Sequence, residues 1–384
     1  MKLFEHETKK LLKAYGIPIP RGELAANSTE ARKAAMKLRP PFVLKAQVLV
    51  AGRGKAGGIL FAENVEEVVR ASRKLFETRV KDIPVKEILV EEKIQVSKEL
   101  FLGITVDRSE RKHAVIASSK GGIEIEEMVT ESPLSVTKTL VNPLKGFTIL
   151  NAHKTAKKLG YAGSQLTKLT GILEKLYTAA LDYDAELIEI NPLAETADGT
   201  FVALDARLIV DNNALFRHPE LEKRFFDEER ENTLEEIEAA KSGLAYVKLK
   251  GNIGVVGNGA GLVMATLDMI NYFGGSPADF LDLGGGADAN RIAKALEIVM
   301  SNPNVNAVLI NILGGMTRCD EVAKAIIETR NEAPVMKPLV IRLLGTNEEE
   351  GRRILEKSHI SALDSMEEAA KHAVEIGKGN GKWA

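Results

Sequence analysis

The chain has 384 residues, enough for two or three domains, and its 45% hydrophobic and 28% charged residues are typical of a globular protein with a substantial core. Its 52 Lys and Arg against 54 Asp and Glu give a formal net charge of −2, which excludes a global positive field for nucleic acid or an anionic membrane. The single cysteine, Cys319, excludes an internal disulfide framework and a cysteine-based zinc site.

The N-terminal segment, MKLFEHETKK, carries charges where a secretory signal peptide needs an apolar core. No apolar run in the sequence approaches the ~18 residues of a membrane-spanning helix. We therefore expect a cytoplasmic protein.

A glycine-rich loop joins two predicted strands in FVLKAQVLVAGRGKAGGIL. Glycine lets backbone amides approach a ligand, and the cations of this loop can neutralise phosphate oxygens. Because the Walker spacing is absent, the loop is either a phosphate cradle of another kind or a flexible lid hairpin. Lys45, inside the first strand, is costly to bury without a partner. We expect it to meet a phosphate or a protein carboxylate.

The next segments, ILVEEKI and ELFLGITVDRSERKHAVIASS, read as three more strands, the last two joined at Arg108-Ser109-Glu110. This half of the chain therefore indicates an α+β domain of antiparallel sheets. Glu91 ends the first of these strands, and Glu99 follows eight residues later. In a nucleotide cleft, the backbone here could read an adenine edge and a carboxylate could bind the ribose; surface glutamates are the alternative.

The segment LIEINPLAETADGTFVALD, residues 187–205, predicts a tight hairpin. An Asp198-Gly199 pair between two apolar runs is a strong turn signal. Centring the turn there pairs residues whose numbers sum to about 397. Asn191 then faces Asp205 within one residue.

The same hairpin gathers oxygen ligands for a metal ion. Glu189 shares a face with Asn191, because side chains alternate along a strand. Mg²⁺ takes one or two protein oxygens together with substrate phosphates, so Asn191 and Asp205 suit a nucleotide-bound Mg²⁺. An edge hairpin with solvated polar residues is the alternative. Pro192 requires an edge strand or a bulge.

The C-terminal half repeats a strand-then-helix pattern after an acid-rich stretch at residues 216–242, which we expect to be a partly packed helical connector or a solvated linker helix. Alternating strands and helices predict a doubly wound parallel sheet. The expected strands are Asn252–Gly257, Asp279–Leu283, Ala307–Ile312, Pro338–Leu343 and Ile360–Leu363.

Glycines gather at the carboxyl ends of these strands, where such sheets bind ligands. They are Gly257-Asn258-Gly259, Gly284-Gly285-Gly286 and Gly314-Gly315. The last precedes a predicted helix whose free amides can hold an anion; a structural turn is the alternative. Cys319, near that helix start, is either a packed residue or a thiol of lowered pKa, and we favour the packed residue. None of the six histidines pairs with another at metal-ligand spacing.

Taken in order, these motifs resemble those of the β subunit of succinyl-CoA synthetase, also called succinate-CoA ligase. The resemblance runs almost end to end through EHETKKLLKAYGIPIP, VLKAQVLVAGRGKAGG, LVEE, KELFLGITVDR, EINPL, ALDAR, NALFRHPE, GNIGVVGNGAGLVMATLD, FLDLGGGA and NILGGMTRCD. It implies an ATP-grasp domain at residues 1–240, with the connector included, and a flavodoxin-like CoA-ligase domain at residues 245–384.

The resemblance also implies residue roles, carried over position by position. The implied nucleotide contacts are Lys45, Gly52, Arg53 and Gly54 for phosphates, Glu91 and Ile94 for adenine, and Glu99 for ribose. Asn191 and Asp205 match Mg²⁺ ligands, and Glu189 matches the carboxylate that orients a phosphohistidine. Asn258, Gly315, Met316 and Thr317 match segments that bind succinate or its phosphate. Family members often carry Gly-Ile-Val at the last three positions, so Thr317 adds a hydroxyl group that bears on acid specificity.

The implied reaction is succinate + ATP + CoA = succinyl-CoA + ADP + phosphate, a reversible step of the tricarboxylic acid cycle that uses Mg²⁺. In this family the phosphorylated histidine and the main CoA-binding domain belong to an α subunit, and no histidine of this chain fits that role. The alternatives are a malate-CoA ligase β subunit and a non-catalytic nucleotide-sensing subunit. Pro20, near the expected base pocket, favours ATP over GTP, and both αβ and α₂β₂ assemblies fit.

Overall fold

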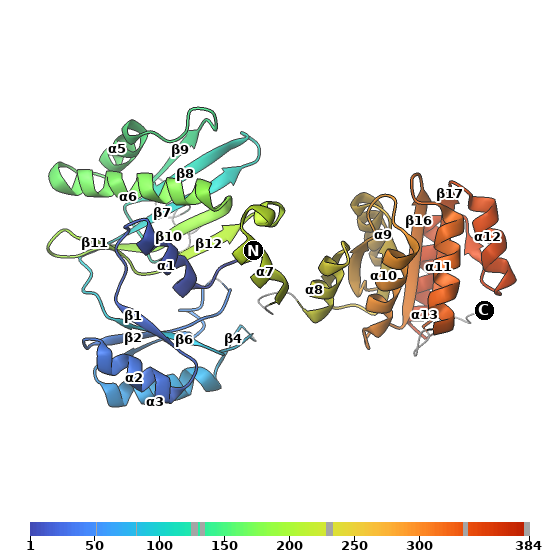
Figure 1. The fold of residues 1–384 in the computed structure, drawn as a ribbon, viewed down its shortest axis with the longest axis horizontal. Helices are drawn as coiled ribbons and strands as arrows, with labels where there is room; N and C mark the ends of the chain where they lie inside the picture. The colour runs from blue at the N-terminus through green and yellow to red at the C-terminus, as the bar shows by residue number, and fades with distance from the viewer. Residues whose placement is uncertain are drawn as a thin grey trace. The chain divides into compact units, whose positions relative to one another are not determined.

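The structure is a computed structural model that describes residues 1–50, 52–81, 83–123, 130, 135–227, 233–332 and 337–379. Contacts along the chain divide it into two compact units, Met1–Glu222 and Lys223–Ala384, each with its own sheet structure (Figure 1). This division lies earlier than the boundary at 240–245 expected from the sequence. The limits of the two domains as independent folding units stay a prediction.

The first unit opens with an antiparallel four-stranded sheet in the order β1-β6-β2-β3. Helices α2 and α3 pack against it (Figure 1), and each begins at an asparagine, Asn27 or Asn64, whose side chain accepts a hydrogen bond from the third helical residue. The bounds are β1 Gly22–Ala25, α2 Ser28–Lys37, β2 Phe42–Ala46, β3 Ile59–Ala62, α3 Val65–Glu77 and β6 Ile88–Glu92, with a small ribbon of β4 Arg79–Val80 and β5 Ile83–Pro84. The predicted strand, glycine loop and strand are confirmed as β2 and β3.

A second antiparallel sheet completes this unit, in the order β11-β10-β7-β8-β9, with β12 also paired to β10. Helices α5 and α6 pack together against it, and α1 packs on β12. The bounds are α1 Glu5–Ala14, β7 Lys98–Asp107, β8 Lys112–Ser118, β9 Val136–Val141, α5 Ile149–Lys158, α6 Gly163–Asp182, β10 Ala185–Glu195, β11 Phe201–Ala203 and β12 Ala206–Val210. The turn predicted at Arg108-Ser109-Glu110 joins β7 to β8.

The predicted hairpin is confirmed in its register. Leu193 pairs with Ala203, and Ile190 with Ala206, so paired numbers sum to 396 where the sequence indicated about 397. Gly199 takes a φ of +71°, a left-handed conformation that glycine adopts without strain. The returning strand differs from the prediction because it is interrupted after Ala203, which leaves two strands, β11 and β12.

Pro192 sits at an irregularity of β10, as its residue type requires. The pairing of β10 with β7 shifts register between Ile190 and Leu193, because proline has no N–H to donate to a neighbouring strand. Pro192 still forms a backbone hydrogen bond across the hairpin, because its carbonyl accepts from the Leu204 N–H at 3.0 Å. The bulge therefore lies directly beside the interruption between β11 and β12.

The second unit is a doubly wound sheet in the order β13-β15-β14-β16-β17-β18. The five predicted strands are confirmed and are parallel, whereas β13, at the edge, is antiparallel and was not predicted. The strands are β13 Ala245–Lys248, β14 Ile253–Gly257, β15 Asp279–Asp282, β16 Ala307–Gly314, β17 Leu339–Gly345 and β18 Ala362–Leu363; the helices are α9 Ala260–Tyr272, α10 Ala289–Ser301, α11 Cys319–Glu332, α12 Glu348–Lys357 and α13 Met366–Gly377.

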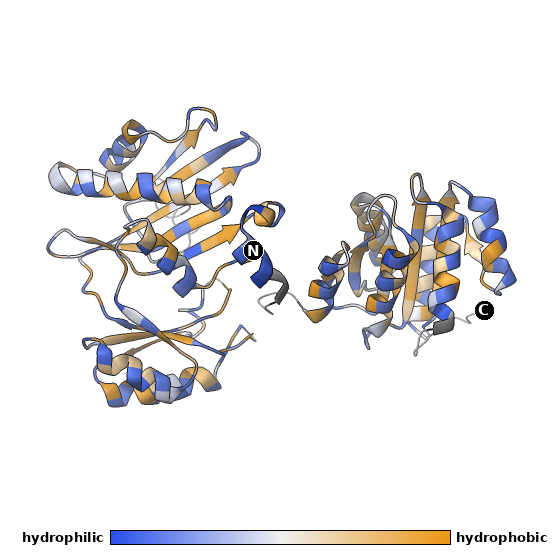
Figure 2. Cartoon of the chain, in the orientation of Figure 1, coloured by the Kyte–Doolittle hydropathy of each residue, from blue (hydrophilic) through white to orange (hydrophobic). Residues whose placement is uncertain are grey.

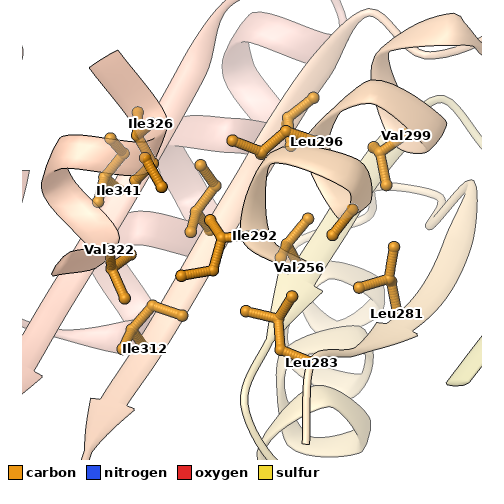
Figure 3. Packing of buried hydrophobic residues seen from close by; sticks show 14 of the residues in the cluster. Val256, Leu281, Leu283, Ile292, Leu296, Val299, Ile312, Val322, Ile326 and Ile341 are labelled. Carbon is orange, nitrogen blue, oxygen red and sulfur yellow. The ribbon is translucent and has the colours of Figure 1, made fainter. Parts of the chain in front are cut away.

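Helices cover both faces of this sheet. On one face α10 and α11 pack into an apolar cluster that includes Val256, Ile292 and Ile341 (Figure 3), and a separate cluster beneath α9 and α13 fills the other face. The strands are mostly orange in Figure 2, while the helices around them mix blue and orange. Burial on both faces explains why these strands read as continuous apolar runs.

The described residues of the predicted helical connector form two short helices, and a 3₁₀ helix leads into it. They are the 3₁₀ helix η2 Asn212–Arg217, α7 Pro219–Asp227 and α8 Leu234–Lys241. Helix α8 packs on β13 and α10, and its buried residues include Ile237, so a partly packed connector is confirmed over a fully solvated one. Of the helices that the structure describes, none has the length and apolar content needed to span a membrane.

Candidate active site

The first unit contains a cavity of about 260 Å³ whose walls bring together two predicted motifs. One wall is the glycine-rich loop with Gly52, Arg53 and Gly54, and another is the hairpin with Glu189, Asn191 and Asp205. These six residues were selected from separate segments of the sequence. Their convergence on one cavity makes it the candidate active site.

The hairpin register explains why its polar residues face the same space. Glu189 pairs with Arg207 across β10 and β12, and the Asn191 N–H donates to the Asp205 carbonyl at 3.0 Å. Residues two apart on a strand share a face. All four side chains accordingly line the cavity, and Arg207 adds a cation that was not singled out from the sequence.

Arg53 reaches from the loop to two carboxylates. Its Nη2 atom donates to Asp205 Oδ1 at 2.8 Å and to Glu5 Oε2, and its Nη1 atom donates to the Ala46 carbonyl at 3.0 Å. Burial alone would lower the pKa of the Arg53 guanidinium, but Asp205 and Glu5 outweigh burial and raise that pKa above its usual range. Arg53 therefore stays charged at the cavity wall.

Lys45 meets protein carboxylates, one of the two outcomes predicted for it. Its Nζ atom lies 3.0 Å from Glu5 Oε1 and 3.0 Å from Glu91 Oε2, and it also donates to the Leu204 carbonyl. Burial disfavours the ammonium, yet Glu5 and Glu91 more than compensate and raise the pKa of Lys45. Lys45 lies behind the cavity wall and is joined to it through Glu5.

Glu5 and Lys9 belong to this site but were missed from the sequence. Lys9 Nζ lies 2.7 Å from Glu5 Oε1 and 2.6 Å from Glu91 Oε1. The side chains of Glu5 and Lys9, both on α1, are each only 2% exposed. Burial would raise the pKa of Glu5, but Arg53 and Lys45 hold it well below its usual range. The available signal was the i, i+4 spacing of opposite charges on a helix, which usually marks a solvated face.

The predicted metal ligands offer hard oxygen atoms in an accessible position. The Asp205 side chain is 32% exposed, and Asn191 Oδ1 accepts from the Gly122 N–H at 2.8 Å while its Nδ2 donates to the Ile123 carbonyl at 2.9 Å. A carboxamide oxygen has a second lone pair, so Asn191 can still bind a cation. In the described part of the chain no three His, Cys, Asp or Glu side chains cluster to cage a metal, and the donor set fits Mg²⁺ held by few protein ligands and by phosphates.

The residues expected to bind the base and ribose are not part of this cavity lining. Glu91 is buried in β6 with its carboxylate committed to Lys9 and Lys45. Ile94 lies between β6 and β7, and Glu99 lies near the start of β7, half-buried. Their roles in nucleotide binding stay predictions.

The glycine loops of the second unit meet at one edge of its sheet, as predicted. Asn258 Nδ2 donates to the Leu313 carbonyl and its Oδ1 accepts from the Leu313 N–H, both at 2.8 Å. The Gly286 N–H donates to Thr317 Oγ1 at 3.1 Å. The hydroxyl of Thr317 is thus already an acceptor inside the fold, whereas Met316, beside it, is 81% exposed.

Cys319 is a packed helix residue, as favoured from the sequence. It is fully buried at the start of α11, and its N–H donates to the Thr346 carbonyl at 2.9 Å. Burial, reinforced by Glu348 and Asp320, raises the pKa of the thiol. The alternative of a lowered thiol pKa is therefore wrong, because desolvation destabilises the thiolate more than the nearby helix N-terminus stabilises it.

Comparison with known proteins agrees with this architecture. A model of the ATP-grasp domain family matches residues 2–195, and a model of the CoA-ligase family matches residues 256–376. A solved structure of ATP citrate lyase from Methanothrix soehngenii, in complex with citrate and coenzyme A, has a TM-score of 0.76 over 98% of this chain and 99% of that one. At 18% sequence identity, this likeness concerns the fold alone.

Curated relatives match nearly the whole chain. The ADP-forming succinate–CoA ligase β subunit of Ignicoccus hospitalis is 47% identical over 98% of this chain and 100% of the relative, and that of Desulfurococcus amylolyticus is 46% identical over 99% and 100%. The GDP-forming β subunit of Thermus thermophilus is 44% identical over 97% of this chain and 98% of its own length. The chain therefore belongs to the succinate–CoA ligase β-subunit family, with an ATP-grasp domain followed by a CoA-ligase domain.

Proposed function

We propose that this chain binds Mg²⁺ and ATP at the cavity of the first unit and passes the γ-phosphoryl group to a histidine of a CoA-binding α subunit. The observation that carries the proposal is the convergence of the Arg53 loop and the Glu189, Asn191 and Asp205 face on one cavity. Phosphoryl transfer depends mainly on positioning and on neutralising negative charge. The cavity supplies both, from a glycine loop, two arginines and an oxygen-rich hairpin.

Each side chain has a distinct task in this proposal. Asn191 and Asp205 would hold Mg²⁺, which when bound neutralises phosphate charge and orients the phosphates. Arg53 and Arg207 face the phosphates, and the Gly52 and Gly54 amides can approach their oxygens. Glu189 would orient the incoming histidine, because a carboxylate that accepts from one ring nitrogen leaves the other available for phosphorylation.

The overall reaction balances in three steps. The γ-phosphoryl group leaves ATP for the partner histidine and releases ADP; a succinate carboxylate then takes that group and forms succinyl phosphate. The CoA thiol attacks the acyl carbon, so that phosphate leaves and a thioester forms. The Asn258 and Gly315-Met316-Thr317 loops of the second unit would bind succinate or its phosphate. We place this reaction in the tricarboxylic acid cycle and the chain in the cytoplasm, as an αβ or α₂β₂ assembly.

The acid specificity tests the proposal directly. The chain, reconstituted with its α subunit, is incubated with ATP, Mg²⁺ and CoA and with either succinate or malate, and the CoA thioesters are separated and quantified. We expect succinyl-CoA as the main product. A large preference for malate would favour a malate-CoA ligase, and no thioester from either acid would favour a nucleotide-sensing subunit.

Nucleotide choice is a second readout of the same assay. We expect ATP to be preferred, although one relative at 44% identity is named as GDP-forming. Pro20 is buried just before β1, and the family resemblance implies that it lies near the base pocket. Comparing ATP with GTP at equal concentration separates the two nucleotides; equal rates would contradict the ATP preference without touching the phosphoryl-transfer assignment.

A further inference from the structure

The carboxylate of Glu5 is shared by the two cations expected to bind phosphate. Its Oε1 atom accepts from Lys45 Nζ at 3.0 Å, and its Oε2 atom accepts from Arg53 Nη2. Lys9, one turn further along α1, lies 2.7 Å from the same Oε1 atom. Glu5 also forms part of the cavity wall. The nucleotide contacts proposed above do not include Glu5.

The protein's own carboxylates occupy the donors that a phosphate would need. An ammonium group has three donors, and those of Lys45 go to Glu5, Glu91 and the Leu204 carbonyl. The two donors on Nη2 of Arg53 go to Glu5 and Asp205. A phosphate oxygen can take an N–H from this atom only when one of its present partners withdraws.

Burial decides which partner can withdraw. The side chain of Glu5 is 2% exposed, whereas that of Asp205 is 32% exposed. A buried carboxylate that loses its cations is left uncompensated in a medium that solvates it poorly, so Glu5 is fixed. Asp205 can turn towards solvent or a metal ion at much lower cost.

Resting on the proposed function, we propose that Glu5 is a positioning residue that anchors Arg53 at the cavity wall and Lys45 behind it, while Asp205 is the exchangeable partner of Arg53. The three cations Lys9, Lys45 and Arg53 balance the three carboxylates Glu5, Glu91 and Asp205. When Asp205 turns to Mg²⁺, the other five groups keep one net positive charge. That charge and the freed N–H of Arg53 then face the phosphates.

The test is equilibrium binding of MgADP and of AMP to the full chain, measured by calorimetry, with AMP also measured by competition. Glu5→Gln keeps the shape of the side chain but removes its charge. We expect it to weaken MgADP binding about tenfold, because Arg53 and Lys45 lose the carboxylate that fixes their positions, and this loss outweighs the added positive charge. AMP lacks the β-phosphate, and its affinity should change by less than about twofold.

Glu7→Gln is the matched control. Glu7 stands on the same helix, and its Oε2 atom accepts from the Phe4 N–H at 2.7 Å, a bond that a glutamine oxygen can keep. The same charge is therefore removed two residues away without touching Arg53 or Lys45. We expect Glu7→Gln to bind MgADP and AMP as the wild type does.

Each outcome decides a separate point. Equal MgADP affinity in Glu5→Gln and wild type would overturn the anchoring role, and so would a parallel loss for AMP and MgADP, which indicates a general structural defect. No MgADP binding by the wild type would instead overturn the proposed function. If Glu5→Gln does not fold, Glu5→Asp replaces it: a carboxylate shorter by one methylene cannot reach both cations, so MgADP affinity should fall while AMP affinity holds.

Discussion

At the scale of single residues, Lys45, Arg53 and Asp279 show two ways in which this chain buries an ionisable group. In the first unit, Lys45 and Arg53 are buried among carboxylates that raise their pKa values. In the second unit, Asp279 is fully buried with one hydrogen bond, from the Val255 N–H to its Oδ1 at 3.0 Å, and its Oδ2 has no partner among the described residues. Burial raises the pKa of Asp279 to about 8. Its carboxyl group is therefore protonated at neutral pH.

Asp279 predicts a pH dependence of stability. Because the pKa of Asp279 is raised on folding, its contribution to stability is complete below the unfolded pKa of about 4 and is lost as pH rises towards about 8. The slope is on the order of 1.4 kcal/mol per pH unit for one proton. Asp279→Asn should lose less stability than wild type between pH 6 and pH 8, measured by urea unfolding.

The control for this measurement is Asp268→Asn, which makes the same substitution at an exposed position of α9. Its stability should follow the wild-type pH profile. Parallel profiles for wild type and Asp279→Asn would contradict a protonated Asp279.

At the scale of elements, the loops at the edge of the second sheet are held by close backbone approaches. Gly345 has a φ of +110°, and a Cβ atom there would lie 2.2 Å from the Gly314 carbonyl oxygen. The Thr346 N–H donates to the same carbonyl at 3.2 Å, and Thr346 Oγ1 donates to the Gly315 carbonyl at 2.9 Å. The end of β17 thus shapes the loop proposed to bind succinate.

A pair of glycine substitutions tests this packing. Gly345→Ala should destabilise the second unit by roughly 2–4 kcal/mol, since it adds both a clash and an unfavourable φ. Gly261→Ala, at a helical position of α9 where a Cβ meets no atom within 4 Å, should be neutral or stabilising by up to ~1 kcal/mol. Urea unfolding gives the free energy of unfolding of each variant. Equal free energies for Gly345→Ala and Gly261→Ala would contradict the close backbone packing at Gly345.

The sequence predicted the elements with strong local patterns. The hairpin register followed from the Asp198-Gly199 turn, and the parallel strands followed from their apolar runs. Strand β13 was missed because it has only four residues, Ala245–Lys248, and because its exposed Val247 is apolar, so the sequence shows no apolar–polar alternation there. The interruption between β11 and β12 was missed because it depends on backbone bonds to Pro192 and on Lys45, which lies about 160 residues away along the chain.

The site was predicted in the same uneven way. Residues in glycine loops or beside turns were found, whereas Glu5 and Lys9 look like an ordinary surface pair on an amphipathic helix. Only the fold, which packs α1 on β12, turns that pair inward. A local sequence pattern cannot predict which charged side chains are buried by contacts between distant parts of the chain.

At the scale of the whole molecule, the chain has an ATP-grasp domain with the proposed nucleotide site in its first unit and a CoA-ligase domain in its second. Its family membership implies that a partner subunit completes the reaction. Among the described residues, His218 is paired with Asp184 at 2.9 Å, and no histidine lines the candidate cavity. In the proposed function, the acceptor of the phosphoryl group is a histidine of the partner subunit.

The most direct test is transfer of the γ-phosphoryl group from labelled ATP to the α-subunit histidine in the reconstituted complex. Asp205→Asn removes the carboxylate proposed to hold Mg²⁺, and Asp198→Asn makes the same change in the exposed turn of the same hairpin. We predict labelling at least about 100-fold slower for Asp205→Asn and within about twofold of wild type for Asp198→Asn. Labelling of the α-subunit histidine at the wild-type rate by Asp205→Asn would contradict the account.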